Sequence, residues 1–297
     1  MNSTSNINEK VTILIVTFKS HHIIEKCLDN IDKKFNIILL ENSDDFEFTA
    51  NLEKKYKNLK CINIGFDSGF GYALNRGVER VKTDYFIAMN PDTFPEEGCL
   101  EKLIKTAENY EDVAMVTPLT LLKENRVEFS AYGYFNKEKP FKNSENKMKV
   151  DWVNGNIFLM NKKIFLEIGG FDEKIFIEYD ERELQRRIYL FKKQILIDFN
   201  AKSQHLDGKS ADEKFAFQMK CERSWHNAWS GFYYYKKHFG TMYALYKSLP
   251  FALINLLKFL YFLILRDNNK SKIYRLFFLG FVNSLLNRKS LYRAEID

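Results

Sequence analysis

Short apolar runs alternate along the first 110 residues with segments whose apolar side chains recur at helical spacing. The runs at 11–18, 36–40, 60–64 and 84–89 are short and mostly apolar, which predicts buried strands. Apolar positions recur every three or four residues within 23–31, 70–81 and 100–107, which predicts helices. This alternation is typical of an α/β fold with a mostly parallel, Rossmann-like sheet and flanking helices.

The pattern changes after residue 117. It predicts a strand over 152–160, a helix over 162–168 that ends at Gly169 and Gly170, a helix from 178 to about 191, and a strand over 194–198. Beyond Ala211 the spacing predicts helix throughout. We therefore expect a folded domain over 1–240 and a separate apolar, basic helical region over 241–297.

The C-terminal region combines apolar and basic residues. Residues 249–265 read LPFALINLLKFLYFLIL, and a second apolar stretch covers 273–286. Residues 231–297 hold eleven Lys or Arg against three acids, a net charge of +8, which leaves −2 for the rest of a chain whose total is +6. Seventeen residues is the lower limit for crossing a bilayer, so we expect helices that lie in the interface of an anionic membrane, or a shallow hairpin. The alternative is a buried packing helix in a soluble oligomer.

Two further observations bear on location and partners. The four cysteines are far apart, and no apolar leader precedes the first predicted strand, so we expect a reducing cytoplasmic compartment and attachment to the inner face of the membrane. A nucleic-acid partner is not expected, because the basic excess is confined to the apolar tail.

Polar residues follow each of the first four predicted strands. They are Thr17, the cluster from Glu41 to Ser43, Asn63 with Gly65, and Asn90 with Asp92. In open α/β sheets the ligand binds beyond the carboxyl ends of the strands, so these clusters predict a binding site on one rim. Ordinary turn chemistry would explain any single cluster.

Several of these segments carry chemistry. Asp92 is a natural ligand for a hard divalent cation, and the glycine-rich run 63–77 opens a helix whose N-terminus could face a phosphate, although it matches neither a dinucleotide fingerprint nor a P-loop. Asp180 and Glu181 are candidate bases, and the helix macrodipole also favours acids at that place. His205 could give a neutral imidazole to a metal, with Lys209 and Ser210 reaching phosphate oxygens.

In their order, these motifs resemble the family-2 inverting glycosyltransferases with the A-type fold, and most closely the bacterial rhamnosyltransferase-like branch that acts in cell-surface polysaccharide assembly. The resemblance covers about residues 11–240. The motifs that carry it are VTILIVTF at 11–18, the acid after the second strand, the Asn-x-Gly run at 63–77, Asn90-Pro91-Asp92-Thr93, Trp152-Val153-Asn154-Gly155, Gly169-Gly170-Phe171-Asp172 with the following acids, and His205-x-x-Gly208-x-Ser210.

The resemblance implies roles for particular residues. Thr17, Glu41 and Ser43 would hold the nucleotide, and Asn75, Lys209, Ser210 and Arg187 would shape the donor pocket. Asp92 and His205 would bind a divalent cation, Mn²⁺ or Mg²⁺. Trp152, Asn154 and Gly155 would line the acceptor side. The base maps to Glu181, but the acidic pair is reversed relative to the family, so Asp180 remains the alternative. Glu41 stands where Asp is common, and Asn90 leaves Asp92 as the metal motif's one carboxylate.

The sequence therefore predicts a glycosyltransferase that moves a sugar, such as rhamnose from dTDP-rhamnose, to a lipid-linked saccharide in cell-surface polysaccharide synthesis. One alternative is a sugar nucleotidyltransferase, for which a glycine-rich loop would be expected after the first strand, where 17–22 has no glycine. The other is a membrane-bound scaffold of the same fold that has lost its chemistry.

Overall fold

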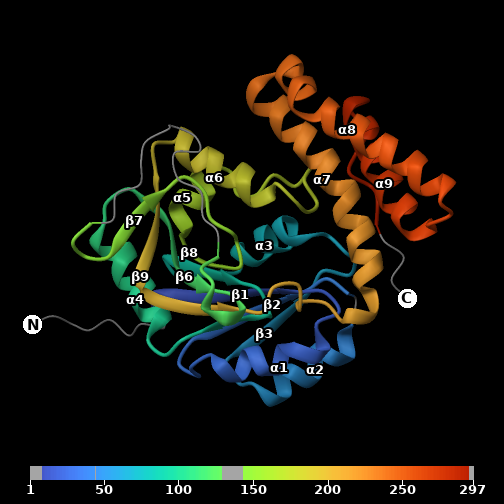
Figure 1. Cartoon of the computed structure of the whole chain (residues 1–297). Helices are drawn as coiled ribbons and strands as arrows, with labels where there is room; N and C mark the ends of the chain where they lie inside the picture. The colour runs from blue at the N-terminus through green and yellow to red at the C-terminus, as the bar shows by residue number, and fades with distance from the viewer. Residues whose placement is uncertain (1–8, 44, 129–142, 294–297) are drawn as a thin grey trace, which may run out of the picture. The chain divides into compact units, whose positions relative to one another are not determined.

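The computed structural model describes residues 9–43, 45–128 and 143–293. Its N-terminal part alternates strands and helices (Figure 1), as the apolar pattern predicts. The elements are β1 (Val11–Thr17), α1 (His21–Asn30), β2 (Asn36–Glu41), α2 (Phe46–Lys55), β3 (Leu59–Asn63), α3 (Phe70–Val78) and β4 (Tyr85–Met89).

The remainder of the chain adds further strands and then helices alone. The elements are β5 (Thr93–Pro95), α4 (Cys99–Asn109), β6 (Val113–Leu121), η2 (Lys123–Asn125), β7 (Lys147–Val150), β8 (Ile157–Asn161), α5 (Lys162–Glu167), α6 (Asp180–Leu190), β9 (Gln194–His205), η3 (Glu213–Phe215), α7 (Ala216–Phe239), α8 (Thr241–Ile264) and α9 (Asn268–Leu285). The helical character predicted beyond Ala211 is confirmed for α7, α8 and α9.

One sheet joins the strands in the order β3-β2-β1-β4-β8-β6-β9-β5, and β7 also pairs with β9. The predicted parallel arrangement is confirmed for β3, β2, β1 and β4. The other half is mixed, because β8 runs antiparallel to both β4 and β6, and β5 and β7 run antiparallel to β9. Two predicted strand boundaries were wrong: the strand expected over 152–160 begins only at Ile157, and the one expected over 194–198 continues to His205.

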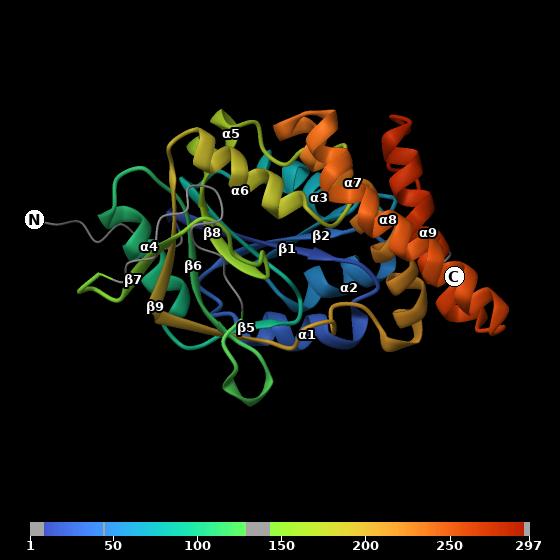
Figure 2. The same cartoon turned by 45° about the horizontal axis from the view of Figure 1, so that its top comes forward.

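Helices cover both faces of this sheet (Figure 2). α1 and α4 pack against one face of β1, where their apolar side chains form the main core with Val11, Ile13 and Ile15. α3 and α5 lie against the other face, where Gly77 contacts Leu40 and the ring of Phe165 packs edge-on against Phe86. The apolar spacing of each helix therefore matches the face that it buries.

The cysteines are free thiols. Cys27 lies in α1 and Cys99 at the start of α4, both within the main core, and Cys221 is buried in α7. Burial disfavours the thiolate, so it raises the pKa of Cys27 and of Cys99 to about 12.

The chain divides into two compact units, which we call the sheet unit and the helical unit. The sheet unit comprises Met1–Ser68, Tyr72–Phe171 and Leu184–Asp212. The helical unit comprises Gly69–Gly71, Asp172–Glu183 and Glu213–Asp297. The functional boundary that we expect at residue 240 is a different division and stays a prediction.

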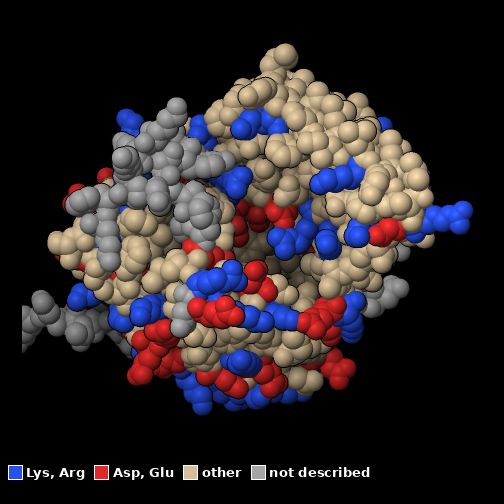
Figure 3. All heavy atoms as spheres, in the orientation of Figure 1, with Lys and Arg blue, Asp and Glu red and all other residues tan. Residues whose placement is uncertain are grey.

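In the helical unit α7, α8 and α9 pack against one another around Ala228, Phe232, Ala244, Ala252 and Phe281. α8 has 24 residues and contains an 18-residue stretch with a mean hydropathy of 1.5, so by length and composition it could cross a membrane. Only 11% of that stretch is buried. Large apolar side chains are exposed along it, including Met242, Tyr246, Phe251, Leu257 and Ile264. Figure 3 shows a broad face over these helices with few charged side chains.

Candidate active site

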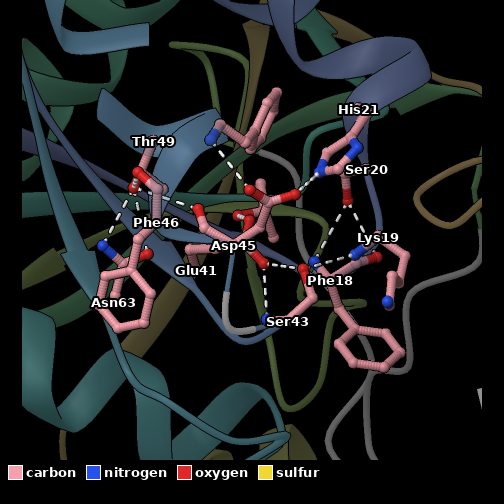
Figure 4. A network of polar contacts seen from close by, with 12 residues as sticks. Phe18, Lys19, Ser20, His21, Glu41, Ser43, Asp45, Phe46, Thr49 and Asn63 are labelled. Atoms are coloured by element: carbon pink, nitrogen blue, oxygen red, sulfur yellow. Dashed lines mark hydrogen bonds and ion pairs between the residues drawn. The ribbon is translucent and has the colours of Figure 1, made fainter. Parts of the chain in front are cut away.

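The ends of β1 and β2 bring together three of the predicted nucleotide-binding residues, Thr17, Glu41 and Ser43, of which Figure 4 labels Glu41 and Ser43. The parallel register pairs Thr17 with Glu41. The Thr17 hydroxyl donates to Glu41 Oε2 at 2.7 Å, and the Ser43 backbone N–H donates to Glu41 Oε1 at 2.6 Å. The Glu41 side chain is fully buried, with 0% of its surface exposed. Their mutual placement is thus confirmed, whereas their role toward a nucleotide stays a prediction.

Neighbouring loops extend this polar rim. Lys19 has a φ of +51° and its N–H donates to Ser43 Oγ at 3.4 Å. The Asp45 carboxylate caps α2 by accepting from Phe48 N at 2.9 Å. The Thr49 hydroxyl donates to Asn63 Oδ1 at 3.2 Å, which ties the end of β3 to α2. The predicted convergence of polar clusters on one rim is therefore confirmed for the first three strands (Figure 4).

Asp92 and His205 are brought together by pairing of β5 with β9, which places Thr93 opposite His205. His205 Nε2 lies 3.5 Å from Asp92 Oδ1. The other oxygen, Asp92 Oδ2, accepts a hydrogen bond from the Lys209 backbone N–H at 3.1 Å. Both side chains are buried. The fold thus brings these two side chains together, and their role toward a cation stays a prediction.

Asp92 and His205 shift each other's pKa. Burial alone would raise the pKa of Asp92, but His205, the Ser210 hydroxyl and the Lys209 N–H outweigh it and lower that pKa. Burial likewise disfavours the imidazolium, but the Asp92 and Glu128 carboxylates outweigh it and raise the pKa of His205 to about 10. Without a cation, the pair is therefore an ion pair.

The chemistry of this pair fits a hard divalent cation. Among the described residues, Asp92 Oδ1 is one of the buried side-chain atoms that have no hydrogen-bond partner. A buried carboxylate oxygen without a hydrogen bond is costly unless it has a ligand. No group of three or more His, Cys, Asp and Glu side chains suited to a metal exists within 9–43, 45–128 and 143–293. A cation held here would therefore complete its coordination shell with water, and with phosphate oxygens when a nucleotide is bound.

Glu128 joins this site, although sequence reasoning did not identify it. Its Oε1 lies 3.4 Å from His205 Nδ1. Asn154 Nδ2 donates to Glu128 Oε1 at 2.7 Å, and Asn156 Nδ2 donates to Glu128 Oε2. Glu128 is an isolated acid in a segment without apolar periodicity, so no local signal could have found it.

The predicted acceptor residues Trp152, Asn154 and Gly155 lie in the loop before β8. The side chain of Gln185 in α6 holds this loop: its Oε1 accepts from Val153 N at 2.8 Å and its Nε2 donates to Val153 O at 2.9 Å. A cavity of about 330 Å³ lies beside the loop, lined by residues that include Val153, Asn154, Thr120 and Glu128. The acceptor role of the loop stays a prediction.

Two residues expected at the donor pocket bond the backbone of the turn after α5. Asn75 exchanges hydrogen bonds with the backbone of Phe171, at 2.9 and 3.0 Å. Arg187 donates to the carbonyl oxygens of Ile168 at 2.5 Å and Gly170 at 2.6 Å. Gly169, directly after the C-cap residue Ile168, has a φ of +87°, the left-handed conformation that commonly ends a helix. These contacts assign both side chains a structural task, and donor binding by them stays a prediction.

Lys209 and Ser210 follow β9 in the loop beside Asp92. The Lys209 backbone N–H bonds Asp92, and its carbonyl oxygen lies 2.9 Å from His22 Nε2. His22 is a second residue that the sequence did not point to. The loop therefore presents a lysine and a hydroxyl close to the candidate cation position, where an anionic ligand would be bound.

The two candidate bases form the first turn of α6 and belong to the helical unit. Glu178 and Tyr179, which precede them, have φ values of +61° and +66°, a left-handed conformation that costs non-glycine residues about 1 kcal/mol or more each. Asp180 is 6% exposed, and burial together with the Glu178 carboxylate raises its pKa to about 7. Glu181 is half-buried. Strain and a shifted pKa of this kind are typical of functional sites.

Within the helical unit, side chains of α7 hold the segment 172–183, which carries the two candidate bases. Lys237 Nζ lies 2.6 Å from the fully buried Glu183 carboxylate and 2.7 Å from Asp172. Tyr233 donates to the same Asp172 at 2.8 Å, and Ser230 donates to the Ile177 carbonyl oxygen at 3.0 Å. Buried charges need such partners, so the network fixes the segment on both sides of Asp180.

The mixed sheet with its polar rim and Asp92–His205 pair defines an A-type glycosyltransferase fold, and comparison with known proteins supports this class. The model of the glycosyl transferase family 2 matches residues 12–169, and the chain therefore belongs to that family. Among solved structures, the mannosyltransferase PcManGT from Pyrobaculum calidifontis, in complex with GDP-Man and Mn²⁺, has a TM-score of 0.57 and 12% identity over 94% of this chain and 88% of its own. GalNAc-T7 with UDP, GalNAc and Mn²⁺ has a TM-score of 0.54 and 13% identity over 66% and 43%.

Two curated relatives are rhamnosyltransferases. Rhamnosyltransferase WbbL of Escherichia coli K12 is 27% identical, with 61% of this chain and 77% of the relative aligned. The N-acetylglucosaminyl-diphospho-decaprenol L-rhamnosyltransferase of Mycobacterium tuberculosis is 19% identical, with 61% and 71% aligned. The chain is thus a rhamnosyltransferase-like member of glycosyltransferase family 2, as its motifs predict.

Proposed function

We propose that this glycosyltransferase moves a sugar, with rhamnose as the first candidate, from a nucleoside diphosphate to a hydroxyl of a lipid-linked saccharide in cell-surface polysaccharide synthesis. The two rhamnosyltransferase relatives support the sugar. The name of the mycobacterial relative describes an acceptor carried on a diphospho-decaprenol, which supports a lipid-linked acceptor here.

The buried Asp92 oxygen that lacks a hydrogen bond, beside His205, is the observation that carries this proposal. Both similar solved structures contain Mn²⁺ together with a nucleotide or nucleotide sugar. A divalent cation, Mn²⁺ or Mg²⁺, would neutralise charge on the departing diphosphate, and Asp92 and His205 would hold it. Lys209 and Ser210 would bind the phosphate oxygens, and Thr17, Glu41 and Ser43 the nucleoside.

The transfer itself needs a base for the acceptor hydroxyl. Asp180 or Glu181 takes the proton as the acceptor oxygen forms a bond to the anomeric carbon from the face opposite the diphosphate. The bond between the anomeric carbon and the diphosphate oxygen breaks with its electron pair, and the configuration at that carbon inverts. Trp152, Asn154 and Gly155 would line the acceptor side.

The exposed apolar face of α8 would bring the enzyme to its acceptor. A contiguous apolar surface is a hallmark of a protein or membrane contact. α8 also carries Lys247 and Lys258, and Arg266 and Lys270 follow it, which suits the anionic inner face of a cell membrane. We therefore propose a peripheral enzyme on the cytoplasmic side.

The test is release of nucleoside diphosphate from a panel of nucleotide sugars, with Mn²⁺, with Mg²⁺ and with chelator, in the wild type and in Asp92→Asn. The exposed Glu97→Gln is the control for loss of one negative charge. We expect slow cation-stimulated release from one donor, reduced about a hundredfold or more in Asp92→Asn and unchanged in Glu97→Gln. Absence of release and of nucleotide binding with every donor would contradict the proposal and favour a scaffold.

A further inference from the structure

The His205 ring has a carboxylate at each of its two nitrogens. Asp92 Oδ1 lies 3.5 Å from Nε2, and Glu128 Oε1 lies 3.4 Å from Nδ1. Only the Nε2 side faces this Asp92 oxygen, which has no hydrogen-bond partner and beside which the proposed cation would bind. The two nitrogens lie on different edges of the ring. Asp92 is therefore on the side of the proposed cation, and Glu128 is on the side away from it.

We infer that Glu128 is a positioning residue that orients His205 and fixes its tautomer for cation binding; this rests on the cation site proposed above. A neutral imidazole carries one N–H, and the partner of one nitrogen decides which nitrogen keeps its lone pair. A proton on Nδ1 that is donated to Glu128 leaves the lone pair on Nε2, beside Asp92. Histidine ligands of metals commonly have a carboxylate in this outer place.

Glu128 is itself held rigidly enough to act in this way. It follows a tight return of the chain after β6, in which Leu121 and Val127 form an antiparallel bridge and Glu128 N donates to Thr120 O at 2.9 Å. Its two carboxylate oxygens accept from the side chains of Asn154 and Asn156. The side chain is 11% exposed. A carboxylate with fixed partners and little water access is suited to orient a neighbouring ring.

These contacts also connect the cation site to the predicted acceptor loop. Asn154 belongs to that loop and Glu128 to the wall of the adjoining cavity of about 330 Å³. Asn156 Nδ2 donates to Glu128 and also lies 3.3 Å from His205 Nδ1. Because an amide nitrogen cannot accept a proton, Glu128 is the acceptor for a proton on Nδ1. All these residues belong to the sheet unit. The chain Asn154–Glu128–His205–Asp92 therefore runs from the acceptor loop to the cation site.

The experiment is a titration with Mn²⁺ alone, followed by the electron paramagnetic resonance signal of free Mn²⁺, for four variants of the full chain. Glu128→Gln keeps the shape of the side chain and removes its charge, and His205→Ala removes the ring. The double variant combines both changes. Glu124→Gln, an exposed acid on the same return of the chain, is the matched control.

We expect Glu128→Gln to weaken Mn²⁺ binding about ten- to a hundredfold, Glu124→Gln to leave it unchanged, and Glu128→Gln to have no further effect in the His205→Ala background. Circular dichroism checks that each variant folds. If Glu128→Gln fails to fold, Glu128→Asp replaces it as the test of position 128, and it should retain Mn²⁺ binding because it keeps the carboxylate. Unchanged Mn²⁺ affinity in Glu128→Gln, or a further loss in the His205→Ala background, would overturn the inference. Absence of Mn²⁺ binding to the wild type would instead overturn the proposed cation site.

Discussion

Gly69 lies so close to the main chain of Phe176 that a Cβ added to it would be 2.1 Å from the Phe176 carbonyl oxygen. Its φ of +79° also lies in the region that favours glycine. Both residues belong to the helical unit, and Phe176 precedes Asp180 by four residues. A side chain at position 69 would thus displace the segment that carries the candidate bases.

Gly69→Ala should therefore lower both stability and turnover. Gly65→Ala is a matched control, because Gly65 has a similar φ of +84° but no atom lies within 4 Å of its added Cβ. At these φ values each alanine should destabilise the fold by about 1 kcal/mol through backbone strain, and only Gly69→Ala adds a clash with backbone atoms. Thermal melting and nucleoside diphosphate release measure the difference. Equal losses in the two variants would show that the contact with Phe176 has no effect.

The two candidate bases are distinguishable by substitution and by pH. We expect one of Asp180→Asn and Glu181→Gln to reduce turnover by a factor of about 100 or more, with the other retaining activity. A base is active only when it is deprotonated. Burial raises the pKa of Asp180 to about 7, so an Asp180 base would become active as the pH rises toward 7. In that case kcat/KM rises with pH up to about 7 and then levels off.

The pH profile of the wild type, compared with that of the active variant, decides between the two acids. A profile with no break near pH 7 would exclude Asp180 as the base. Full activity in both variants would remove the base from this segment altogether.

His226 makes the helical unit sensitive to acid. Burial, aided by Arg293, outweighs the bond to the Tyr292 carbonyl oxygen and lowers the pKa of His226 from 6.5 to about 3. Between these values the unfolded chain binds a proton that the folded chain does not. The stability due to the neutral His226 is therefore complete above pH 6.5 and is lost as the pH falls toward 3.

Thermal melting of His226→Phe at pH 8 and pH 5 tests this expectation. The variant leaves the Tyr292 carbonyl oxygen without its donor, so it should be about 1–3 kcal/mol less stable at pH 8. Its melting temperature should then fall less than that of the wild type on going to pH 5. His21→Gln, an exposed histidine, should behave like the wild type. An equal fall in His226→Phe would show that another group causes the acid sensitivity.

Membrane attachment through α8 predicts a specific defect. Leu257 and Ile264 are 66% and 80% exposed, so changing both to Glu should hardly affect the melting temperature. The same change should abolish co-sedimentation with anionic phosphatidylglycerol vesicles, because two charges would enter the apolar region of the bilayer. Leu190→Glu, on α6 and 51% exposed, is the control.

Size-exclusion chromatography with light scattering distinguishes membrane attachment through α8 from a contact of α8 between protein chains. Retained vesicle binding in the double variant, together with a smaller particle than the wild type, would identify α8 as a contact between protein chains instead.

Local patterns predicted the first half of the fold because β1 to β4 are short apolar strands joined by amphipathic helices. β9 was predicted too short for a physical reason. Its second part alternates buried and exposed positions, as a strand should, but the buried side chains are Ala201, Ser203 and His205 instead of large apolar residues. The antiparallel place of β8 between β4 and β6 depends on long-range pairing that no local spacing encodes.

In the candidate site, too, local motifs predicted some residues and long-range contacts determine others. Asp92 follows an apolar strand and His205 has a recognisable motif, so both could be named from sequence. Glu128 could not, because its proximity to His205 arises from a return of the chain after β6. Asn75 and Arg187 belong to family motifs, yet their side chains bond the backbone of the turn at 168–171. A motif alone does not tell a ligand contact from a scaffold contact.

The buried thiols provide a kinetic reporter that needs no added label. Cys27 and Cys99 lie in the core of the sheet unit and Cys221 in the helical unit. An alkylating reagent attacks the thiolate, and burial both excludes the reagent and keeps these groups protonated. Each of these three buried cysteines is therefore modified only when the structure around it opens. Mass spectrometry of the alkylated chain over time would thus measure the opening rate of each unit separately, within one intact enzyme.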